Sequence, residues 1–321
     1  MKSIVSLPFK GLPYTDEGFM GYLLRMSNMH HLRGLRWLYK TLERESILRV
    51  LPEDVPTVAA IFQVPDSILA QHFIACYADE GKLCYRVRNQ TLRRLYLLRH
   101  MRPQLCPLCI RENGFSHFLW DFSFVTACTQ HSCTLIDSCP RCLKRIRWSR
   151  PLLSACSCGH AWADTAVQSI GEGSFEYSVA GLVATQTGVD GGSSSITWCP
   201  VTTMLSQVSL STLFELIWAF GIKDIEGDAA SFSKAKAIPR TPLAVKISKL
   251  AHQRLGRLLQ KECTDISVAA EVHLPALLSL AKESLDATDA YWVSFLFHRL
   301  GRSSSLSRHR KYHIPQQLQL F

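Results

Sequence analysis

The chain lacks long hydrophobic runs, although hydrophobic residues make up 47% of its 321 residues. No uninterrupted apolar stretch approaches the roughly 18 residues that are needed to cross a bilayer, so we expect no membrane insertion. The N-terminal residues Met1 to Pro8 contain no apolar core long enough for a secretory signal peptide. Twelve cysteines are too few for a disulfide-dense secreted domain. We therefore expect a cytoplasmic protein in a reducing compartment, where thiols stay free or bind metal.

Acidic side chains are also missing, but only locally. Residues 81–111, 139–158 and 299–321 contain no Asp or Glu, and they hold 18 of the 36 Lys and Arg residues. The rest of the chain carries 18 basic residues against 26 acidic ones. Concentrated basic stretches on a mildly acidic body are typical of proteins that contact phosphate backbones. The alternative is that these charges lie on solvated helix faces and only keep the protein soluble. The candidate nucleic-acid contacts are Arg86, Arg88, Arg93, Arg94, Arg99, Arg145, Arg147, Arg308, Arg310 and Lys311.

Residues of metal-binding type occur in four close pairs within 53 residues. A close pair on a tight turn directs both side chains at one metal ion, and two such pairs complete a tetrahedral site. A closed site of this kind leaves no position for water or substrate, so it indicates a structural role rather than catalysis. The sequence therefore predicts two structural Zn²⁺ ions. The predicted ligands are Cys106, Cys109, Cys128, His131, Cys139, Cys142, Cys156 and Cys158.

Two features of these sites have alternatives at the level of sequence. Neighbouring pairs can share a metal ion, or the first pair can join the third and the second the fourth. Only seven residues separate His131 from Cys139, which permits either arrangement. We favour the sequential pairing because it needs no threading of the chain. Cys133, two residues after His131, is an alternative ligand in place of the histidine.

Hydrophobic periodicity predicts a mainly α fold in which the metal-binding segment lies between helical regions. The predicted parts are an N-terminal helical domain with a helix-turn-helix-like unit over residues 1–102, a double zinc-binding module over 103–165, a Gly- and Ser-rich linker or irregular region over 166–207, and a C-terminal helical domain with a basic tail over 208–321. The C-terminal domain contains a second helix-turn-helix-like unit, with its turn at His273 to Pro275.

The first helix-turn-helix-like unit is predicted from two short apolar patterns, Pro56 to Phe62 and Asp66 to Phe73. Thr91 to Met101 is predicted as a further helix, with Arg93, Arg94 and Arg99 on its outer face. Short helices joined by tight turns are common in any small bundle, so the pattern alone does not establish DNA binding.

Two segments carry a resemblance to a known family. The residues Pro13 to Arg25 follow the pattern P-x-x-D-E-S-x-x-S-[WY]-L-x-R, with Gly18 and Gly21 in place of the two serines. The cysteine and histidine pairs from Cys106 to Cys158 follow the central zinc pattern of the same family in order. On these motifs the chain resembles the TniQ/TnsD family of bacterial transposition target-selection proteins. Because it is shorter than TnsD-type members, it is more similar to the TniQ subtype found in CRISPR-associated transposons.

The resemblance implies a non-enzymatic adaptor in bacterial DNA transposition. Such an adaptor links a target-bound, Cascade-type complex to an AAA+ ATPase of the TnsC type, which recruits the transposase, while guide-RNA pairing reads the sequence. The implied partners are Cascade-type CRISPR effector subunits, guide RNA, target DNA, the ATPase and, in a head-to-tail dimer, a second copy of the chain. The implied location is the bacterial cytoplasm, with nucleoid association when the protein is engaged.

Other functional classes make different demands on the residues. A TnsD-like protein would select an attachment site by binding a specific DNA sequence directly. A zinc hydrolase needs an open metal position or clustered carboxylates, whereas all four pairs here are predicted to serve as ligands of closed sites. A zinc deaminase needs a His-x-Glu motif ahead of its Pro-Cys-x-x-Cys motif, and none precedes the cysteine pairs suitably.

Overall fold

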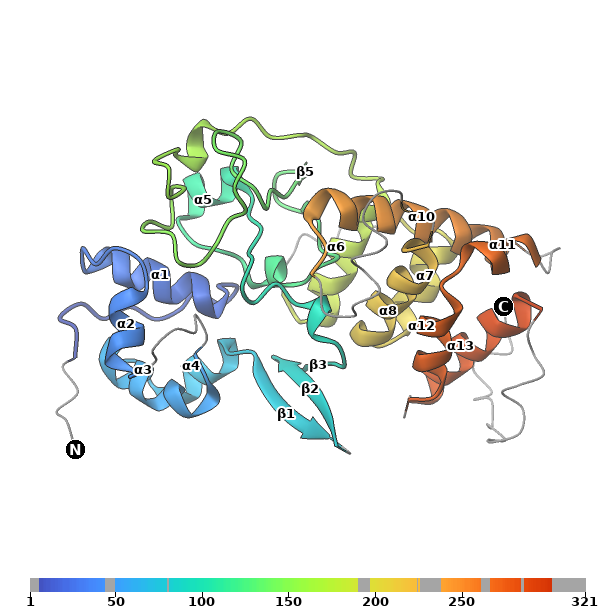
Figure 1. Cartoon of the computed structure of the whole chain (residues 1–321), viewed down its shortest axis with the longest axis horizontal. Helices are drawn as coiled ribbons and strands as arrows, with labels where there is room; N and C mark the ends of the chain where they lie inside the picture. Colours follow the sequence, from blue (N-terminus) through green and yellow to red (C-terminus); the bar gives the residue numbers. More distant parts are fainter. Residues whose placement is uncertain are drawn as a thin grey trace. The chain divides into compact units, whose positions relative to one another are not determined.

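The computed structural model describes residues 6–43, 50–79, 81–189, 197–223, 225, 238–260, 266–283 and 286–301. The chain divides into two compact units, whose elements are labelled in Figure 1. Unit 1 comprises residues 1–196 and 238–242, and unit 2 comprises 197–237 and 243–321. The predicted N-terminal helical domain and the predicted zinc-binding module both lie in unit 1. The fold is mostly helical, in agreement with the sequence.

Unit 1 begins with four helices that form a small bundle. They are α1 (Phe19–Met29), α2 (Arg36–Thr41), α3 (Val55–Phe62) and α4 (Asp66–His72). Residues Phe19, Tyr22, Leu23 and Met26 of α1 are buried, at the i, i+3, i+4, i+7 spacing of one helix face. Helices α3 and α4 lie where the sequence predicts the first helix pair, within one residue at each end. Gln63 connects them in the left-handed conformation, with φ 55°.

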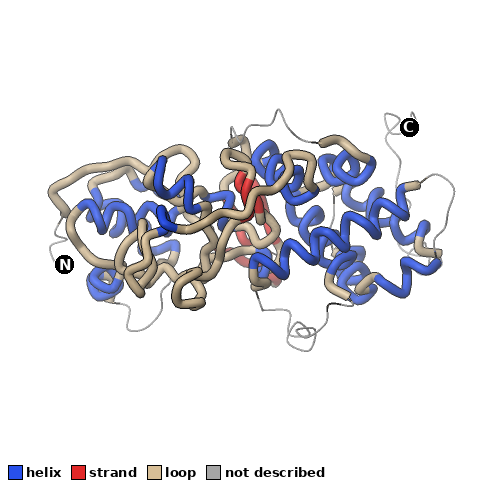
Figure 2. Tube along the Cα trace, turned by 90° about the horizontal axis from the view of Figure 1, so that it is seen from above, coloured by secondary structure: helices blue, strands red, loops and turns tan. Residues whose placement is uncertain are grey.

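A three-stranded antiparallel sheet follows the helices and was not predicted. Its strands are β1 (Ala75–Asp79), β2 (Lys82–Val87) and β3 (Gln90–Leu92), in the order β1-β2-β3 (red in Figure 2). The predicted helix over Thr91 to Met101 is therefore wrong. Leu92 pairs with Tyr85 of β2, and a 3₁₀ turn at Leu95–Leu97 replaces the expected helix. Pairing with β2 overrides the helix-like spacing of the apolar residues.

The cysteine-rich part of unit 1 contains little regular secondary structure. Its elements are α5 (Pro107–Asn113), β4 (Ala127–Cys128), β5 (Cys133–Thr134) and 3₁₀ turns at Phe118–Asp121 and Trp162–Asp164. Hydrogen bonds tie this part to α1: the amide of Gly18 donates to the Ser116 carbonyl, and Asn28 donates to the Pro151 carbonyl. An ideal Cβ on Gly21 would lie 2.6 Å from Ser116 Cβ, so the backbone of α1 approaches this segment too closely for a side chain there.

The predicted irregular region over 166–207 contains two helices instead, α6 (Phe175–Gln186) and α7 (Pro200–Gln207). Residues Phe175 through Ala184 of α6 are all buried. A helix that is buried on every side shows no amphipathic period, and its small and apolar residues resemble a linker in composition. The expectation of irregular structure is therefore wrong for both helices.

Unit 2 is a bundle of helices. Besides α7 it contains α8 (Leu210–Gly221), α10 (Thr241–Leu259, whose first two residues belong to unit 1), α11 (Ile266–Glu271), α12 (Leu274–Ala281) and α13 (Ala287–Arg299). Helices α11 and α12 lie where the sequence predicts the second helix pair. The fully buried carboxylate of Asp289, on α13, accepts hydrogen bonds from the Ser209 amide and from the Thr212 hydroxyl at the start of α8. This contact satisfies groups at the helix N-terminus that would otherwise be buried without partners.

None of the helices in the described part of the chain combines the length and the apolarity needed to cross a membrane.

The close packing of α8 on α10 generates a stability prediction. An ideal Cβ on Gly221 would lie 2.1 Å from the Ile247 carbonyl oxygen and 2.6 Å from its Cγ2 atom. Gly221→Ala is therefore expected to lower the free energy of unfolding by about 1–3 kcal/mol through overpacking. Thermal or urea unfolding of the full chain measures this.

Gly256 supplies a matched control on α10. An ideal Cβ there would have only Val201 Cγ2 nearby, at 3.9 Å. Gly256→Ala is expected to raise the free energy of unfolding by about 0.5–1 kcal/mol, because alanine favours a helix interior. Equal shifts for the two variants would show that Gly221 is not at a close helix contact.

Candidate metal centres

The first candidate centre lies where α5 faces the β4–β5 hairpin. Cys106 directly precedes α5, and Cys109 lies in the first turn of the helix. The helix begins at Pro107, because the first helical position tolerates a residue without an N–H group. Cys128 ends β4, and His131 follows in the turn to β5. The ligand atoms of the four residues all lie within 4.8 Å of one another.

Several pairs of ligand atoms in this centre are close. The Sγ atoms of Cys109 and Cys128 are 3.4 Å apart. His131 Nδ1 lies 3.1 Å from Cys109 Sγ and 3.7 Å from the Sγ atoms of Cys106 and Cys128. The other ring nitrogen, Nε2, lies 2.6 Å from a Glu112 carboxylate oxygen. A proton on Nε2 that is donated to Glu112 leaves the Nδ1 lone pair directed at the three sulfurs, an orientation typical of metal-binding histidines.

The second candidate centre is built from two turns. Leu143, with φ 60°, closes the first turn by donating its amide to the Cys139 carbonyl at 2.8 Å. The second turn passes through Gly159, with φ 86°. The Sγ atoms of Cys139 and Cys158 are 3.7 Å apart, and those of Cys142 and Cys156 are 3.8 Å apart. All four Sγ atoms lie within 4.8 Å of one another.

The geometry of the donor atoms is consistent with tetrahedral coordination of one metal ion in each centre. Four sulfurs bound at about 2.3 Å to one Zn²⁺ lie about 3.8 Å from one another, whereas a disulfide holds its sulfurs about 2.05 Å apart. The observed separations match the first value, and no cysteine among the described residues forms a disulfide. The two clusters can each hold a metal ion. The side chains gather in the sequential arrangement that the sequence favoured, with Cys106, Cys109, Cys128 and His131 in one cluster and the remaining four cysteines in the other.

Cys133 lies beside the first centre without joining its cluster. It is fully buried, opposite Cys128 in the β4–β5 pair, and its Sγ atom is 3.6 Å from Cys106 Sγ. The set of ligand atoms that are mutually close contains His131 and omits Cys133. The geometry thus favours the histidine over the cysteine as the fourth ligand.

Arg99 does not face outward as predicted. Its side chain is fully buried, 3.4 Å from the Asp137 carboxylate, and it donates to the Pro239 carbonyl at 2.8 Å. Burial lowers the pKa of Arg99 to about 10, and Asp137 opposes that shift. Asp137 also accepts the amide of Thr241 at 2.9 Å, which fastens residues 238–242 to the rest of unit 1. Arg99 therefore forms a buried ion pair with Asp137 and cannot reach a nucleic acid.

Two other candidate contacts line a groove of about 670 Å³ in unit 1. Arg86 is exposed on β2, with its guanidinium 5.2 Å from the Tyr77 ring centre. Arg88 is half-buried: it donates to the Thr15 carbonyl and lies 3.9 Å above the Phe118 ring. Residues of α4, including Gln71 and His72, form part of the same groove. A row of side chains with donor groups on a concave surface can contact an anion or a phosphate backbone.

The remaining candidate contacts are in different settings. Arg93 and Arg94 are half-buried, Arg145 lies 3.4 Å from Asp137, and Arg147 is exposed. Arg308, Arg310 and Lys311 lie outside the described residues.

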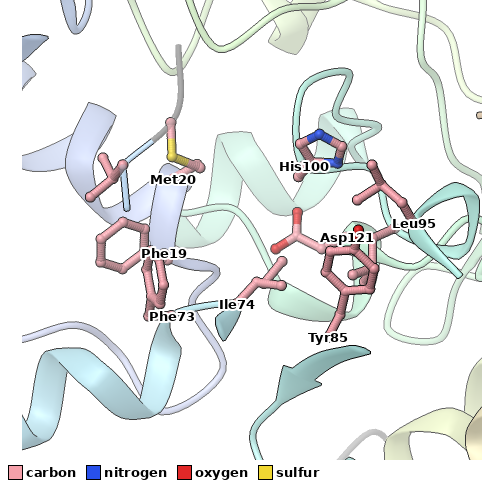
Figure 3. Close-up of a pocket in the computed structure, with 10 residues that line it drawn as sticks. Phe19, Met20, Phe73, Ile74, Tyr85, Leu95, His100 and Asp121 are labelled. Carbon is pink, nitrogen blue, oxygen red and sulfur yellow. The ribbon is translucent and has the colours of Figure 1, made fainter. Parts of the chain in front are cut away.

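A small cavity in unit 1 contains a carboxyl group that sequence reasoning missed. Its volume is about 50 Å³, and Figure 3 shows Asp121 and His100 among otherwise mainly apolar lining residues such as Phe19 and Ile74. In the described part of the chain no hydrogen-bond donor partners the Asp121 carboxyl. Burial raises its pKa to about 8. The group is thus a neutral acid over most of the physiological pH range.

Comparison with known protein families identifies one domain within the chain. Residues 8–135 match the model of the TniQ family, a stretch that covers less than half of the chain. The chain therefore carries a TniQ family domain over these residues, which include the helix bundle, the sheet and the first metal centre. A search of curated proteins found no match.

Metal content distinguishes the ligands of the first centre. Cys106→Ser and His131→Asn are each expected to lower bound zinc from about two ions to about one per chain, because a structural site needs all four donors. Cys133→Ser is expected to keep both ions. Elemental analysis of the purified proteins measures this, and circular dichroism reports folding. Loss of metal from Cys133→Ser, with retention in His131→Asn, would assign Cys133 as the ligand instead.

The buried Asp121 predicts a dependence of stability on pH. Between its ordinary pKa of 3.8 and its folded pKa of about 8, the folded chain holds a proton that the unfolded chain has released. Its contribution to stability is therefore complete at low pH and is lost as the pH rises toward 8. Asp121→Asn should raise the melting temperature relative to the native chain more at about pH 8 than at about pH 5. Asp79→Asn removes an exposed carboxyl and should show no such trend; a constant difference for Asp121→Asn would contradict the assignment.

Proposed function

We propose that this protein is a non-enzymatic adaptor in bacterial DNA transposition, which joins a target-bound complex to an AAA+ ATPase that recruits the transposase. The observation that carries the proposal is the TniQ family domain over residues 8–135. A TniQ domain implies a protein associated with transposition. The TniQ subtype, with a guide-RNA complex of Cascade type as the target-bound partner, is the more specific form of the proposal.

The candidate metal centres support a binding role rather than catalysis. In each centre four donor side chains surround one position, which leaves none open for a substrate or an activated water. Zinc at these positions would stiffen the loop-rich segment without taking part in a reaction. Two rigid metal centres would hold the surrounding backbone and side chains in fixed positions, as a surface that binds partner proteins requires.

The basic groove supports contact with a nucleic acid. Arg86 and Arg88 lie beside polar residues of α4 on one concave surface, and Arg147 is exposed elsewhere in the unit. Guanidinium groups bind phosphate oxygens of RNA or DNA without reading sequence. This suits an adaptor that recognises a guide-RNA complex by shape and backbone.

The alternative function is direct, sequence-specific DNA binding at an attachment site, as in TnsD-type proteins. The two helix pairs, α3–α4 and α11–α12, favour it in outline. The exposed positions of α4 include Asp66, Ser67 and Gln71 but no Lys or Arg, which disfavours α4 as a recognition helix in the major groove.

Reconstitution separates the two functions. The purified full chain is mixed with the ATPase and with the guide-RNA effector complex, and co-elution in gel filtration is measured. We expect a complex with both partners and weak, salt-sensitive binding to duplex DNA alone. Tight, sequence-specific retention of duplex without the guide complex would support the alternative, and failure to bind the ATPase would contradict the adaptor role.

Charge reversal tests the surface. The double substitution Arg86→Glu and Arg147→Glu is expected to weaken association with the guide-RNA complex about tenfold or more, and to reduce the salt dependence of binding by about one unit for each lost phosphate contact. The double substitution Arg36→Glu and Lys40→Glu reverses two exposed charges on α2, outside the basic stretches, and is the charge-matched control. Equal weakening in both proteins would mean that only net charge matters.

A further inference from the structure

A pocket of about 450 Å³ lies beside the first metal centre, within unit 1. Cys109 and Cys128 form part of its lining. The other lining residues combine apolar side chains, such as Leu119 and Val189, with a few polar ones. Both the size and the mixed lining are typical of sites for small organic groups, which have volumes of roughly 300–1,000 Å³. The pocket is therefore a candidate binding site of its own, next to the metal centre.

Four aromatic rings lie in a row that runs from the surface to this pocket. Tyr14 is 51% exposed, and its ring centre lies 4.9 Å from that of Phe115. The ring centre of His117 lies 4.9 Å beyond Phe115, and that of Trp120 lies 5.4 Å beyond His117. Trp120 is 3% exposed, so the row ends in the interior. The last three rings line the pocket, where a planar group can stack on a ring face.

Polar groups of three residues line the same pocket. The Asn113 Nδ2 atom donates to Gln130 Oε1 at 3.0 Å. In the described part of the chain, Asn113 Oδ1, Gln130 Nε2 and the Asp16 carboxylate have no hydrogen-bond partner. These groups offer one donor and two acceptors, which can pair with the edge of a heterocyclic base. A carboxylate in particular accepts a hydrogen bond from the exocyclic amino group of a base.

The basic groove of Arg86 and Arg88 adjoins the pocket. Thr15 lines the groove, and the next residue, Asp16, lines the pocket. Arg88 donates to the Thr15 carbonyl and lies 3.9 Å above the Phe118 ring, while the Phe118 amide donates to the Asp16 carbonyl at 2.9 Å. A strand whose phosphates contact the groove can therefore place one base in the pocket, provided that this base is unpaired.

We propose that the pocket binds the base of an unpaired nucleotide, and that it prefers a base with an exocyclic amino group. Phe115 and His117 stack on the base, and Asp16 accepts a hydrogen bond from the amino group, which thymine and uracil lack. A base in a duplex is stacked on both faces and paired at its edge, so the site favours single strands. This inference rests on the proposed contact between the basic groove and a nucleic-acid backbone.

The test uses the full chain and labelled single strands that differ only in their bases. The probes are abasic deoxyribose chains of roughly 12 nucleotides that carry one central cytosine, one central thymine or no base. Because the probes have equal charge, the groove contributes equally to all three. Fluorescence anisotropy at low ionic strength is expected to show about fivefold or tighter binding of the cytosine probe than of the base-free chain, with thymine between them. A gain from the base on either a deoxyribose or a ribose backbone supports the proposal, and the larger gain identifies the strand.

Matched variants separate stacking from charge. Phe115→Leu keeps an apolar side chain but removes a ring face, so the gain from cytosine should fall below about twofold while the affinity for the base-free chain is unchanged. Phe115→Tyr should retain the gain. Phe9→Leu removes an exposed ring that contacts His30 rather than the pocket, and it is the matched control. Asp16→Ala should abolish the preference for cytosine over thymine, and this ratio decides the question if Phe115→Leu does not fold.

The outcomes distinguish the pocket from the groove and from the adaptor role. Equal affinity of the native chain for the three probes would overturn the proposal, and it is the result expected if the pocket receives a protein side chain instead. A gain that persists in both Phe115→Leu and Asp16→Ala would overturn it as well. Failure of the native chain to bind any probe would contradict the groove contact on which the pocket depends. None of these results alters co-elution with the ATPase, which tests the adaptor role separately.

Discussion

The convergence of eight donor side chains on two points is the constraint on which unit 1 depends. From Pro103 to Thr165 the chain forms one short helix, two-residue strands and 3₁₀ turns, so few repeating backbone hydrogen bonds hold it together. Separations of 3.4 to 3.8 Å between cysteine sulfurs of each centre suit a shared metal ion, and metal coordination can supply the free energy that secondary structure does not. Helix α1 and residues 238–242 are fastened to this segment by hydrogen bonds, and their positions follow from its fold.

The N-terminal motif that resembles the TniQ/TnsD pattern has a structural explanation. Its glutamate, Glu17, is fully buried, and both carboxylate oxygens bind Arg25, the arginine that ends the motif, at 2.7 and 2.6 Å. The glycines at the two positions usually held by serine lie against the cysteine-rich segment. An ideal Cβ on Gly18 would lie 2.9 Å from the Asp121 carboxylate, and one on Gly21 would meet Ser116. The motif therefore docks α1 on the metal-binding segment, which links two separate sequence patterns through one interface.

Local spacing determined what could be predicted from the sequence. The ligand pairs and the helix pairs α3–α4 and α11–α12 depend on residues a few positions apart, and all of them lie where the pattern indicates. The strand pairing of Leu92 with Tyr85, the burial of α6 and the ion pair of Arg99 with Asp137 depend on partners that the pattern does not identify. A buried arginine and a solvated one look identical in a sequence, because only the fold decides whether an acid lies beside it.

The same distinction changes the meaning of the basic stretches. The sequence predicts that these stretches form a surface for phosphate groups, yet Arg99 forms a buried ion pair with Asp137, and Arg145 lies 3.4 Å from the same carboxylate. Arg150 is buried as well, with its guanidinium 5.0 Å from the Trp148 ring centre. With a divalent metal ion in each cluster, seven thiolates and one imidazole would carry a net negative charge, and cationic side chains in the same segment would offset part of it. Among the described residues, Arg86 and Arg147 are the candidate contacts that remain exposed, and so small a set is better matched to a protein that touches a nucleic-acid backbone at a few points than to one that wraps it.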